Sequence, residues 1–377
     1  FAGMAGVFAA AARGGLADAF DAEKAAWTGE YKELKAALTE EEYAAARAST
    51  LNAHYTSPTV IRAIYEALDG MGFEKGNILE PSMGVGNFFG MLPESMVSSQ
   101  LTGVELDSIS GRIARKLYPN ADIKITGYEN TKFADNSFDV AIGNVPFGDY
   151  SLHDKRYDKD HLLIHDYFFV KTLDKVRPGG IVAFVTSKGT LDKANPAARR
   201  LMAEKADLLG AIRLPNTAFK ANAGASVTTD ILFLQKRDTP PEQLPAWTET
   251  GKNADGMELN NYFLQHPEMI LGTMQEVTTQ YGKDTACVPD PNVELEDLLS
   301  AAVLHLGHEN VFQSNTQDMP APETADVFQS NTPIDELRPF SYAVQDGKLM
   351  FKEADGNLVP SEMNATAVKR AISMIGI

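Results

Sequence analysis

Short apolar runs alternate with longer amphipathic segments between Asn77 and Lys236. Buried strands separated by helices are typical of βαβ units, whose strands pair in parallel because each crossover returns the chain to the same edge. The last two runs are separated only by the loop 215–227, which predicts an antiparallel hairpin at the end of the sheet. We therefore expect an α/β fold with a mostly parallel seven-stranded sheet. Its predicted strands are Asn77–Glu80, Leu101–Glu105, Asp122–Ile125, Phe138–Ile142, Ile181–Thr186, Leu208–Ile212 and Asp230–Gln235, and its helices include Ser108–Leu117, His165–Val176 and Pro196–Ala206.

The chain is expected to have three parts. Residues 1–50 form a helical N-terminal extension, in which Thr39 and Glu42 have the spacing of a capping box. Residues 51–237 form the α/β domain, and residues 238–377 form a C-terminal region with a small α+β module. The elements predicted in that region are a helix at Val293–Leu306, a hairpin at Ser341–Phe351 and a closing helix at Ala365–Ile375.

A hexapeptide, VFQSNT, occurs twice in the C-terminal region, at Val311–Thr316 and at Val327–Thr332. Its surroundings, residues 307–335, are rich in Pro and Asp and are interpreted as a linker. The repeat is either a duplicated piece of linker or a pair of docking motifs for a partner. The sequence alone leaves both interpretations open.

The net charge of −17 is unevenly distributed. From Asp238 onward there are 7 basic and 22 acidic residues, a net charge of −15, so residues 1–237 carry only −2. Affinity for a phosphate backbone comes from clustered Lys and Arg, so the tail is an unlikely DNA reader. Residues 188–220 carry a local charge of +4, which indicates either DNA contacts or a solvated helix face. The candidate DNA-binding residues are Lys188, Lys193, Arg199, Arg200 and Lys220.

Several classes of protein are disfavoured by residue usage. The single cysteine, Cys287, excludes an internal disulfide framework and a cysteine-rich zinc site. No apolar run approaches the roughly 18 residues of a membrane span, so we expect a soluble cytoplasmic protein without membrane contacts. The first residue is Phe1 and not Met, and the sequence leaves open whether the chain is a fragment of a longer one. His153, His161 and His165 lie close together among aspartates, but a charged loop that enters a helix is favoured over a metal cluster.

Two glycines and an acidic residue form the first candidate ligand motif. Gly84 and Gly86 follow the first predicted strand, where glycine lets the backbone approach a ligand closely. Glu105 ends the next strand and can accept both hydroxyls of a ribose. The alternative is a pair of turn glycines with a solvated Glu.

Asn144-Val145-Pro146-Phe147 is the more specific motif, and it follows a buried strand at the edge where open α/β sheets bind ligands. The side-chain oxygen of Asn144 and the carbonyl of Val145 can accept both N–H bonds of an exocyclic amine. Such acceptance frees the nitrogen lone pair for attack, without a titrating base. Phe147 can stack on a base extruded from its helix. The alternative is a turn proline beside a buried Phe.

Taken in order, four segments resemble the class I S-adenosylmethionine-dependent adenine-N6 DNA methyltransferases. They are closest to those of phages and integrative elements, in which the methylase often precedes a helicase-like region. The segments are Tyr55–Pro58, Glu80–Gly86, Gly103–Asp107 and Asn144–Phe147. Gly14–Phe20 also resembles an upstream segment of such proteins, so that the resemblance covers residues 14–237 and is strongest over 55–148. It implies a Rossmann-like fold, S-adenosylmethionine as cofactor, and double-stranded DNA with a flipped adenine as substrate.

The resemblance also implies residue roles. Thr56, preceded by Tyr55, would hold the methionine carboxylate. Glu105 would bind the ribose and Leu106 would pack on the cofactor adenine. The methionine pocket would comprise Glu80, Pro81, Ser82, Gly84 and Gly86, and the target base would meet Asn144, Val145, Pro146 and Phe147, with Asn144 also beside the cofactor.

Two segments depart from the family pattern. The usual Asn-Pro-Pro reads Asn-Val-Pro, although Val145 supplies the same backbone carbonyl. The usual Gly-Asp-Phe reads Gly127-Tyr128-Glu129, in which Tyr128 and Glu129 would take the cofactor adenine.

Three functions follow from these motifs. The leading one is methyl transfer to adenine N6 in DNA. A second is methylation of a protein glutamine or an RNA guanine, whose planar NH₂ groups need the same chemistry. A third is a non-catalytic cofactor-binding module of a mobile-element anti-restriction assembly, working with a helicase-like region or partner protein, since this chain has no P-loop motif.

Overall fold

The computed structural model describes residues 19–40, 42–43, 47, 56–219, 227–279, 282–306, 311–312, 342–345, 348–352 and 357–360. The chain divides into two units, 1–314 and 315–377. The larger unit contains the α/β sheet and the candidate site, and the smaller contains a three-stranded sheet.

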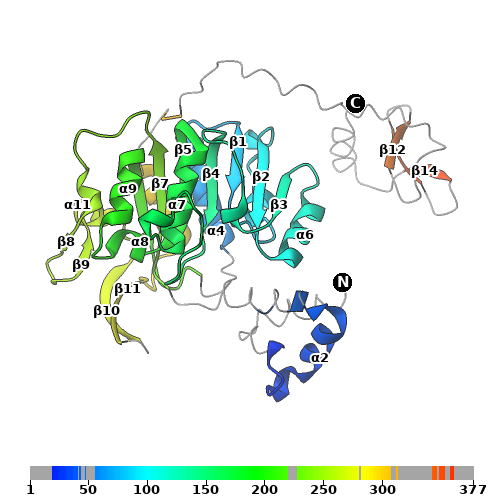
Figure 1. Ribbon diagram of the computed structural model, residues 1–377, viewed down its shortest axis with the longest axis horizontal. Helices are drawn as coiled ribbons and strands as arrows, with labels where there is room; N and C mark the ends of the chain where they lie inside the picture. Colours follow the sequence, from blue (N-terminus) through cyan, green and yellow to red (C-terminus); the bar gives the residue numbers. More distant parts are fainter. Residues whose placement is uncertain are drawn as a thin grey trace. The chain divides into compact units, whose positions relative to one another are not determined.

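A seven-stranded sheet forms the centre of the larger unit (Figure 1), with the strand order β3-β2-β1-β4-β5-β7-β6. All neighbours pair in parallel except β7, which is antiparallel to both β5 and β6. The predicted mostly parallel sheet with an antiparallel terminal hairpin is confirmed. The strands are β1 (Asn77–Glu80), β2 (Gln100–Glu105), β3 (Asp122–Ile125), β4 (Phe138–Asn144), β5 (Val176–Ser187), β6 (Ala206–Leu214) and β7 (Thr229–Lys236).

Local sequence explains where the main helices begin. The Ser57 hydroxyl accepts the Val60 N–H and Pro58 occupies the first turn of α4. The Asp107 carboxylate accepts two backbone N–H groups at the start of α6. The described helices of the larger unit are α2 (Thr28–Ala37), α4 (Pro58–Gly70), α5 (Asn87–Gly90), α6 (Ser108–Leu117), α7 (Ile164–Lys175), α8 (Gly189–Asp192), α9 (Ala197–Lys205), α11 (Asn261–Gln265) and α12 (Leu295–Leu306).

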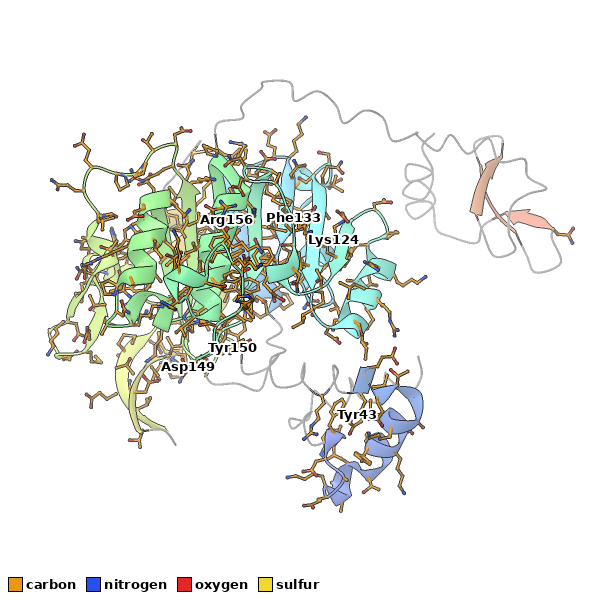
Figure 2. The ribbon with its side chains drawn as sticks, in the orientation of Figure 1. Tyr43, Lys124, Phe133, Asp149, Tyr150 and Arg156 are labelled. Atoms are coloured by element: carbon orange, nitrogen blue, oxygen red, sulfur yellow. The ribbon has the colours of Figure 1, made fainter. Side chains whose placement is uncertain are left out.

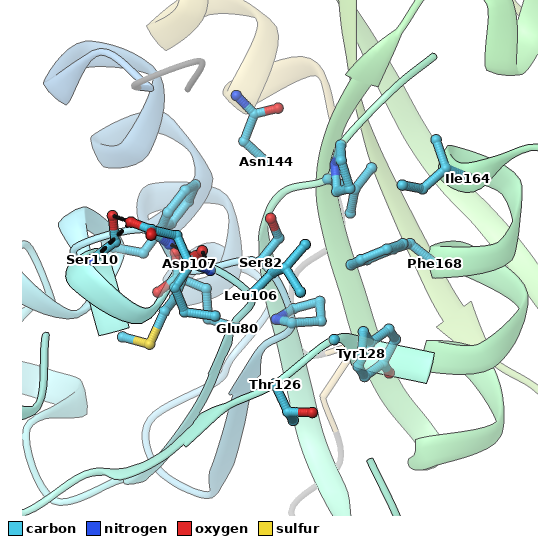
Figure 3. Close-up of a pocket in the computed structure, with 18 of the residues that line it drawn as sticks. Glu80, Ser82, Leu106, Asp107, Ser110, Thr126, Tyr128, Asn144, Ile164 and Phe168 are labelled. Carbon is cyan, nitrogen blue, oxygen red and sulfur yellow. Dashed lines mark hydrogen bonds between the residues drawn. The ribbon is translucent and has the colours of Figure 1, made fainter. Parts of the chain in front are cut away.

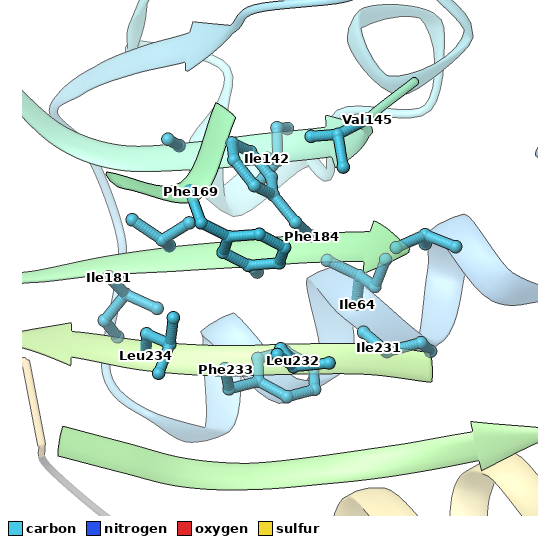
Figure 4. Close-up of a cluster of buried hydrophobic side chains, with 14 of the residues drawn as sticks. Ile64, Ile142, Val145, Phe169, Ile181, Phe184, Ile231, Leu232, Phe233 and Leu234 are labelled. Carbon is cyan, nitrogen blue, oxygen red and sulfur yellow. The ribbon is translucent and has the colours of Figure 1, made fainter. Parts of the chain in front are cut away.

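Apolar side chains on both faces of β4, β5 and β7 make the core (Figure 4). Phe184 and Phe233 are fully buried on neighbouring strands, and Phe169 of α7 packs on Phe184 with ring centroids 5.3 Å apart. Ile64 of α4 is fully buried in the same core. Helices therefore cover the sheet, which explains why its central strands read as continuous apolar runs.

The structure differs from the predicted domain boundary at 237. Trp247, Phe263, Leu299 and Phe312 all belong to the main core, so residues beyond 237 continue to build the larger unit. The acidic composition marked this segment as separate, but charged residues occupy surfaces whether or not apolar neighbours pack inward. Two antiparallel pairs lie in this segment, β8 (Thr250–Lys252) with β9 (Glu258–Asn260), and β10 (Thr273–Thr279) with β11 (Gly282–Val288).

Other flanking predictions fall partly within the described residues. The capping box is confirmed, since the Glu42 N–H donates to Thr39 Oγ1 at 3.2 Å and the Thr39 N–H donates to Glu42 Oε2 at 3.0 Å. The predicted hairpin is formed by β12 (Tyr342–Gln345) and β13 (Lys348–Lys352), with β14 (Leu358–Pro360) beside it. The predicted helix at 365–375 and the second VFQSNT copy lie outside the described residues. None of the helices in the described part of the chain is long and apolar enough to cross a bilayer.

A buried ion pair joins β6 to β7. The Arg213 guanidinium makes two hydrogen bonds of 2.8 Å to the Asp230 carboxylate, and its Nη1 lies 2.7 Å from Asp192 Oδ2. Arg213 and Asp230 have no solvent exposure, and the guanidinium also stacks 4.2 Å from the Phe263 ring centroid. The pair thus connects the sheet to both α8 and α11.

We expect Asp230→Asn to lower the free energy of unfolding by about 3 kcal/mol, because it removes the buried carboxylate that makes both 2.8 Å hydrogen bonds to Arg213 and leaves Asp192 to balance the buried guanidinium. Urea denaturation measures the change. Asp207→Asn is the matched control: its partner Arg237 and Asp207 itself are partly exposed, so the loss there should be below about 1 kcal/mol. Equal losses in the two variants would contradict the assigned role of the buried pair.

Candidate active site

A cavity of about 400 Å³ opens at the carboxyl ends of β1, β2 and β4 (Figure 3). This volume lies in the range of small-molecule sites. Most of the predicted cofactor and catalytic residues line it, although they come from five separate segments. They are Thr56, Glu80, Pro81, Ser82, Gly84, Glu105, Leu106, Tyr128, Glu129, Asn144, Val145 and Pro146.

Three predicted residues are absent from the lining or lie outside the described residues. Phe147 does not line the cavity, although it follows Pro146 directly, and it is half-buried. Gly86 does not line it either: its backbone has φ +86°, and a Cβ there would lie 2.5 Å from Cε2 of Tyr118. Gly86 therefore serves close packing at the start of α5. Tyr55 lies outside the described residues.

Glu105 closes the turn after β1 by binding two backbone amides. The N–H of Gly84 donates to Glu105 Oε2 and the N–H of Asp107 donates to Oε1, both at 2.7 Å. Gly84 has φ +56°, a conformation that favours glycine, and a Cβ there would meet no atom within 4 Å. Each carboxylate oxygen keeps a further lone pair. The turn is thus held in shape while Glu105 can still accept hydroxyl donors from a ligand.

Glu80 is the most buried acid of the cavity. It ends β1, is 2% exposed, and its Oε2 has no hydrogen-bond partner among the described residues. Burial raises the pKa of Glu80 well above its usual range, and the nearby charge of Glu105 raises it further. Burial also raises the pKa of Glu105, while its two backbone hydrogen bonds oppose that rise. A buried and a half-buried carboxyl in one cavity favour a ligand that carries positive charge and N–H or O–H donors.

Asn144 is the last residue of β4 and lines the cavity. Gly143, just before it, has φ +148°, a region open only to glycine, and lies against Glu80 and Pro81. The following residue is fixed as well, since the N–H of Val145 donates to the carbonyl of Val185 at 3.1 Å. The carbonyl of Val145 and the side chain of Asn144 are therefore carried on a rigid strand end beside the cavity.

Apolar walls complete the cavity. Leu106 is 76% exposed although it is a large apolar residue, and Tyr150 is 47% exposed. The motifs did not identify Tyr150, Leu152, Ile164 and Phe168, which come from the segment after β4 and from α7. Tyr150 could have been predicted, because it is an aromatic residue only three positions after Phe147. Leu152, Ile164 and Phe168 have the sequence pattern of ordinary core residues. Figure 2 shows Asp149 and Tyr150 at the end of the sheet away from Arg156 and Phe133.

The Gly127-Tyr128-Glu129 segment forms the wall beyond β3. The Tyr128 hydroxyl lies 3.0 Å from Thr172 Oγ1, and burial raises the pKa of Tyr128, so this phenol belongs to the core. Glu129 lines the cavity, and a Cβ on Gly127 would lie 2.0 Å from Glu129 Oε1. Gly127 therefore makes room for the Glu129 carboxylate.

The predicted DNA-binding residues are engaged within the protein. Arg199 is fully buried, and its guanidinium donates to the backbone carbonyls of Thr248 and Lys193, both at 2.8 Å. The prediction for Arg199 is corrected: a side chain enclosed by the fold cannot contact a phosphate. Lys220 lies outside the described residues. The others form ion pairs, Lys188 with Asp284, Lys193 with Asp166 and Arg200 with Glu249.

The histidine-rich loop gives no metal site among the described residues. His165 is buried on α7, and burial lowers its pKa, while His153 pairs with Asp158 at 2.7 Å. This charged loop leads into α7, which begins at Ile164.

No family model matches the chain. It is 33% identical over 193 residues to "Defense against restriction protein B" of Escherichia phage P1, an alignment that covers 50% of this chain and 8% of that protein. The chain thus spans less than a tenth of this relative.

Two solved structures are similar in fold. One is provisionally named a class I S-adenosylmethionine-dependent methyltransferase, from Listeria monocytogenes, with 19% identity, a TM-score of 0.42, and coverage of 59% of this chain and 78% of that one. The other is a modification subunit of a provisionally assigned type I restriction enzyme from Vibrio vulnificus YJ016, with 17% identity, a TM-score of 0.44, and coverage of 72% and 66%. Identities and TM-scores this low carry no information on function.

We expect Glu80→Gln to make the ligand-free protein more stable than the wild type above neutral pH. The raised pKa of Glu80 means that the native state keeps its proton to higher pH than the unfolded state does. The protonated Glu80 side chain contributes its full stabilisation when the pH is below the usual pKa of a carboxyl group. That contribution is lost as the pH rises through the raised pKa of Glu80. The advantage of the variant should therefore vanish at acid pH.

Thermal unfolding between pH 4 and pH 8 measures this difference. Glu74→Gln is the control, because Glu74 is exposed and lies outside the cavity. A constant difference across the pH range for Glu80→Gln would show that the buried carboxyl does not titrate as assigned.

Proposed function

We propose that this chain binds S-adenosylmethionine and transfers its methyl group to the N6 amine of adenine in DNA. The observation that carries the proposal is the shared cavity: Asn144, Val145 and Pro146 line the same space as Glu80, Gly84 and Glu105. One edge of the sheet therefore carries both groups that the reaction needs. Asn144 and Val145 offer two acceptors for an amine, and Glu80 and Glu105 suit a cationic nucleoside.

The cavity fits the cofactor's chemical groups. The buried, unpartnered oxygen of Glu80 suits a cationic ammonium, and the free lone pairs of Glu105 suit ribose hydroxyls. Thr56 is buried in the wall just before the N-terminus of α4, where the helix dipole favours a carboxylate. Leu106 offers an exposed apolar side chain for the adenine ring, and Glu129 an acceptor for the adenine amine.

The target amine would be activated by acceptors alone. The cofactor supplies an electrophilic methyl group on a sulfonium. The Asn144 amide oxygen and the Val145 carbonyl each accept one N–H of the adenine amine, which takes the nitrogen lone pair out of conjugation with the ring. Methyl transfer would form the N–C bond at the expense of the sulfonium S–C bond, whose electron pair would stay on sulfur. The extra proton on nitrogen then leaves to water.

Aromatic residues beside the motif suit a flipped base. Phe147 follows Pro146 directly, and Tyr150 is nearly half exposed on the cavity wall. Stacking on such rings compensates part of the energy lost when a base leaves its helix. The site therefore favours a planar aromatic substrate over a flexible glutamine side chain.

A β-ribbon lies at the same sheet edge as the cavity. The β10–β11 hairpin extends from the main body beyond that edge (Figure 1). Its base is fixed there, because the N–H of Asn216 donates to the Cys287 carbonyl and the N–H of Cys287 donates to Thr228 Oγ1. A two-stranded ribbon fits the major groove of DNA.

The phage relative is named for defence against restriction, and DNA methylation is a chemistry that blocks restriction. We include in the proposal that the chain works beside further domains or partners, such as a helicase-like region, in an anti-restriction assembly.

We expect Asn144→Ala to bind S-adenosylhomocysteine within about threefold of the wild type and to lose at least about a hundredfold in methylation rate, because one of two acceptors is gone. Isothermal titration calorimetry measures binding. Tritium transfer to DNA, followed by digestion to nucleosides and mass analysis, measures the product. Asn120→Ala, exposed and outside the cavity, is the control. Full activity in Asn144→Ala, or tritium found in protein or RNA instead of N6-methyladenine, would refute the proposal.

We expect Leu106→Ala to weaken S-adenosylhomocysteine binding by about tenfold, because less apolar surface is buried against the adenine ring. Leu117→Ala removes a similarly exposed leucine that does not line the cavity, so its affinity should equal that of the wild type. Calorimetric titration of the two variants compares them directly. Equal affinities would place the adenine ring elsewhere.

A further inference from the structure

The first VFQSNT copy is anchored to the main body by its first two residues. Phe312 is 8% exposed, and its N–H donates to the carbonyl of Met71 at 2.8 Å. Its ring meets that of Phe73 edge-on, with centroids 5.0 Å apart. The carbonyl of Val311 accepts a hydrogen bond of 3.1 Å from Gln235 Nε2.

These contacts form a small binding site, here named the dipeptide socket: Met71, Phe73, Arg177 and Gln235. The Arg177 guanidinium lies 4.8 Å from the Phe312 ring centroid, and its Nε donates to Asp139 at 2.6 Å. The four residues come from the end of α4, the loop before β1, the start of β5 and the end of β7. The socket therefore lies at the amino-terminal edge of the parallel strands, at the opposite edge from the cavity.

The same hexapeptide occurs again at Val327–Thr332. We propose that this second copy is an alternative occupant of the dipeptide socket, so that the chain can dock in two registers sixteen residues apart. Every socket contact is made to the backbone or ring of the Val-Phe dipeptide, and the second copy provides the same groups. The inference does not depend on methyl transfer.

Chain length decides which copy fills the socket. Helix α12 ends at Leu306, so the first copy closes a loop of about 5 residues and the second a loop of about 21. The entropic free-energy cost of closing a loop grows as 3/2 RT times the logarithm of its length. Docking of the first copy is therefore favoured over docking of the second by about tenfold. The first copy occupies the socket in the structure, in agreement with that preference.

A change of register would shorten the connection to the C-terminal unit. With the first copy docked, 29 residues separate Phe312 from the start of β12 at Tyr342, and with the second docked, 13 separate Phe328 from it. The repeat thus gives the chain two tether lengths for that unit. A ligand that competes with the first copy for the socket, or that binds the first copy elsewhere, would favour docking of the second copy and hence the shorter tether.

A double-mutant cycle on the full chain tests this proposal. Phe312→Ala should reduce the equilibrium constant for folding by only about tenfold, because the second copy takes its place. Phe328→Ala alone should change nothing measurable. The double variant has no phenyl ring to fill the socket. Its equilibrium constant for folding should fall by more than about a hundredfold, as for other buried Phe→Ala changes. Fluorescence of Trp247, which lies in the main core, reports unfolding in urea.

Phe340→Ala added to Phe312→Ala is the control, since Phe340 lies outside both copies and should add no loss. If Phe312→Ala alone loses as much as the double variant, the second copy does not dock and the proposal fails. It also fails if the stability of Phe312→Ala rises with protein concentration, because the occupant then comes from another chain. If the double Ala variant does not fold, the same cycle is repeated with Phe312→Leu and Phe328→Leu, which should cost less folding stability.

Discussion

The parallel pairing of β1 with both β2 and β4 is the constraint on which the candidate site depends. Glu80 pairs in register with Gly103 of β2, and Leu79 with Ala141 of β4, so the three strands end at one edge. Glu80, Glu105 and Asn144 come from positions up to 64 residues apart, yet they line one cavity. A shift of one residue in either pairing would turn one of these side chains away from the cavity.

Buried charge is distributed in two contrasting ways in this fold. Arg213 and Asp230 satisfy each other within the sheet, and their role is structural. Glu80 is equally buried, but no described residue pairs with its Oε2. A buried acid without a counter-charge costs stability unless a ligand supplies one. Our proposal that the cavity binds a cationic ligand depends on this difference between Glu80 and the Arg213–Asp230 pair.

Basic residues in 188–220 show the limit of counting charges along a sequence. The local excess of +4 suggested a phosphate-binding face, but Arg199 is enclosed by backbone carbonyls, and Lys188, Lys193 and Arg200 pair with acids. Two of those acids, Glu249 and Asp284, lie beyond residue 237, in the segment that composition had marked as a separate part. Long-range pairing neutralised the excess, and no local window contains both partners.

The sequence by itself determined the seven strands, the position of the hairpin at the end of the sheet and half of the cavity lining. These features depend on local periodicity and on the rule that parallel strands share one carboxyl edge. Only the tertiary structure decided that Gly86 serves packing, that Arg199 is buried, that Tyr150 and Phe168 join the cavity, and that Phe312 docks beside Phe73. Each of these depends on contacts between residues distant in the chain, which neither periodicity nor composition encodes.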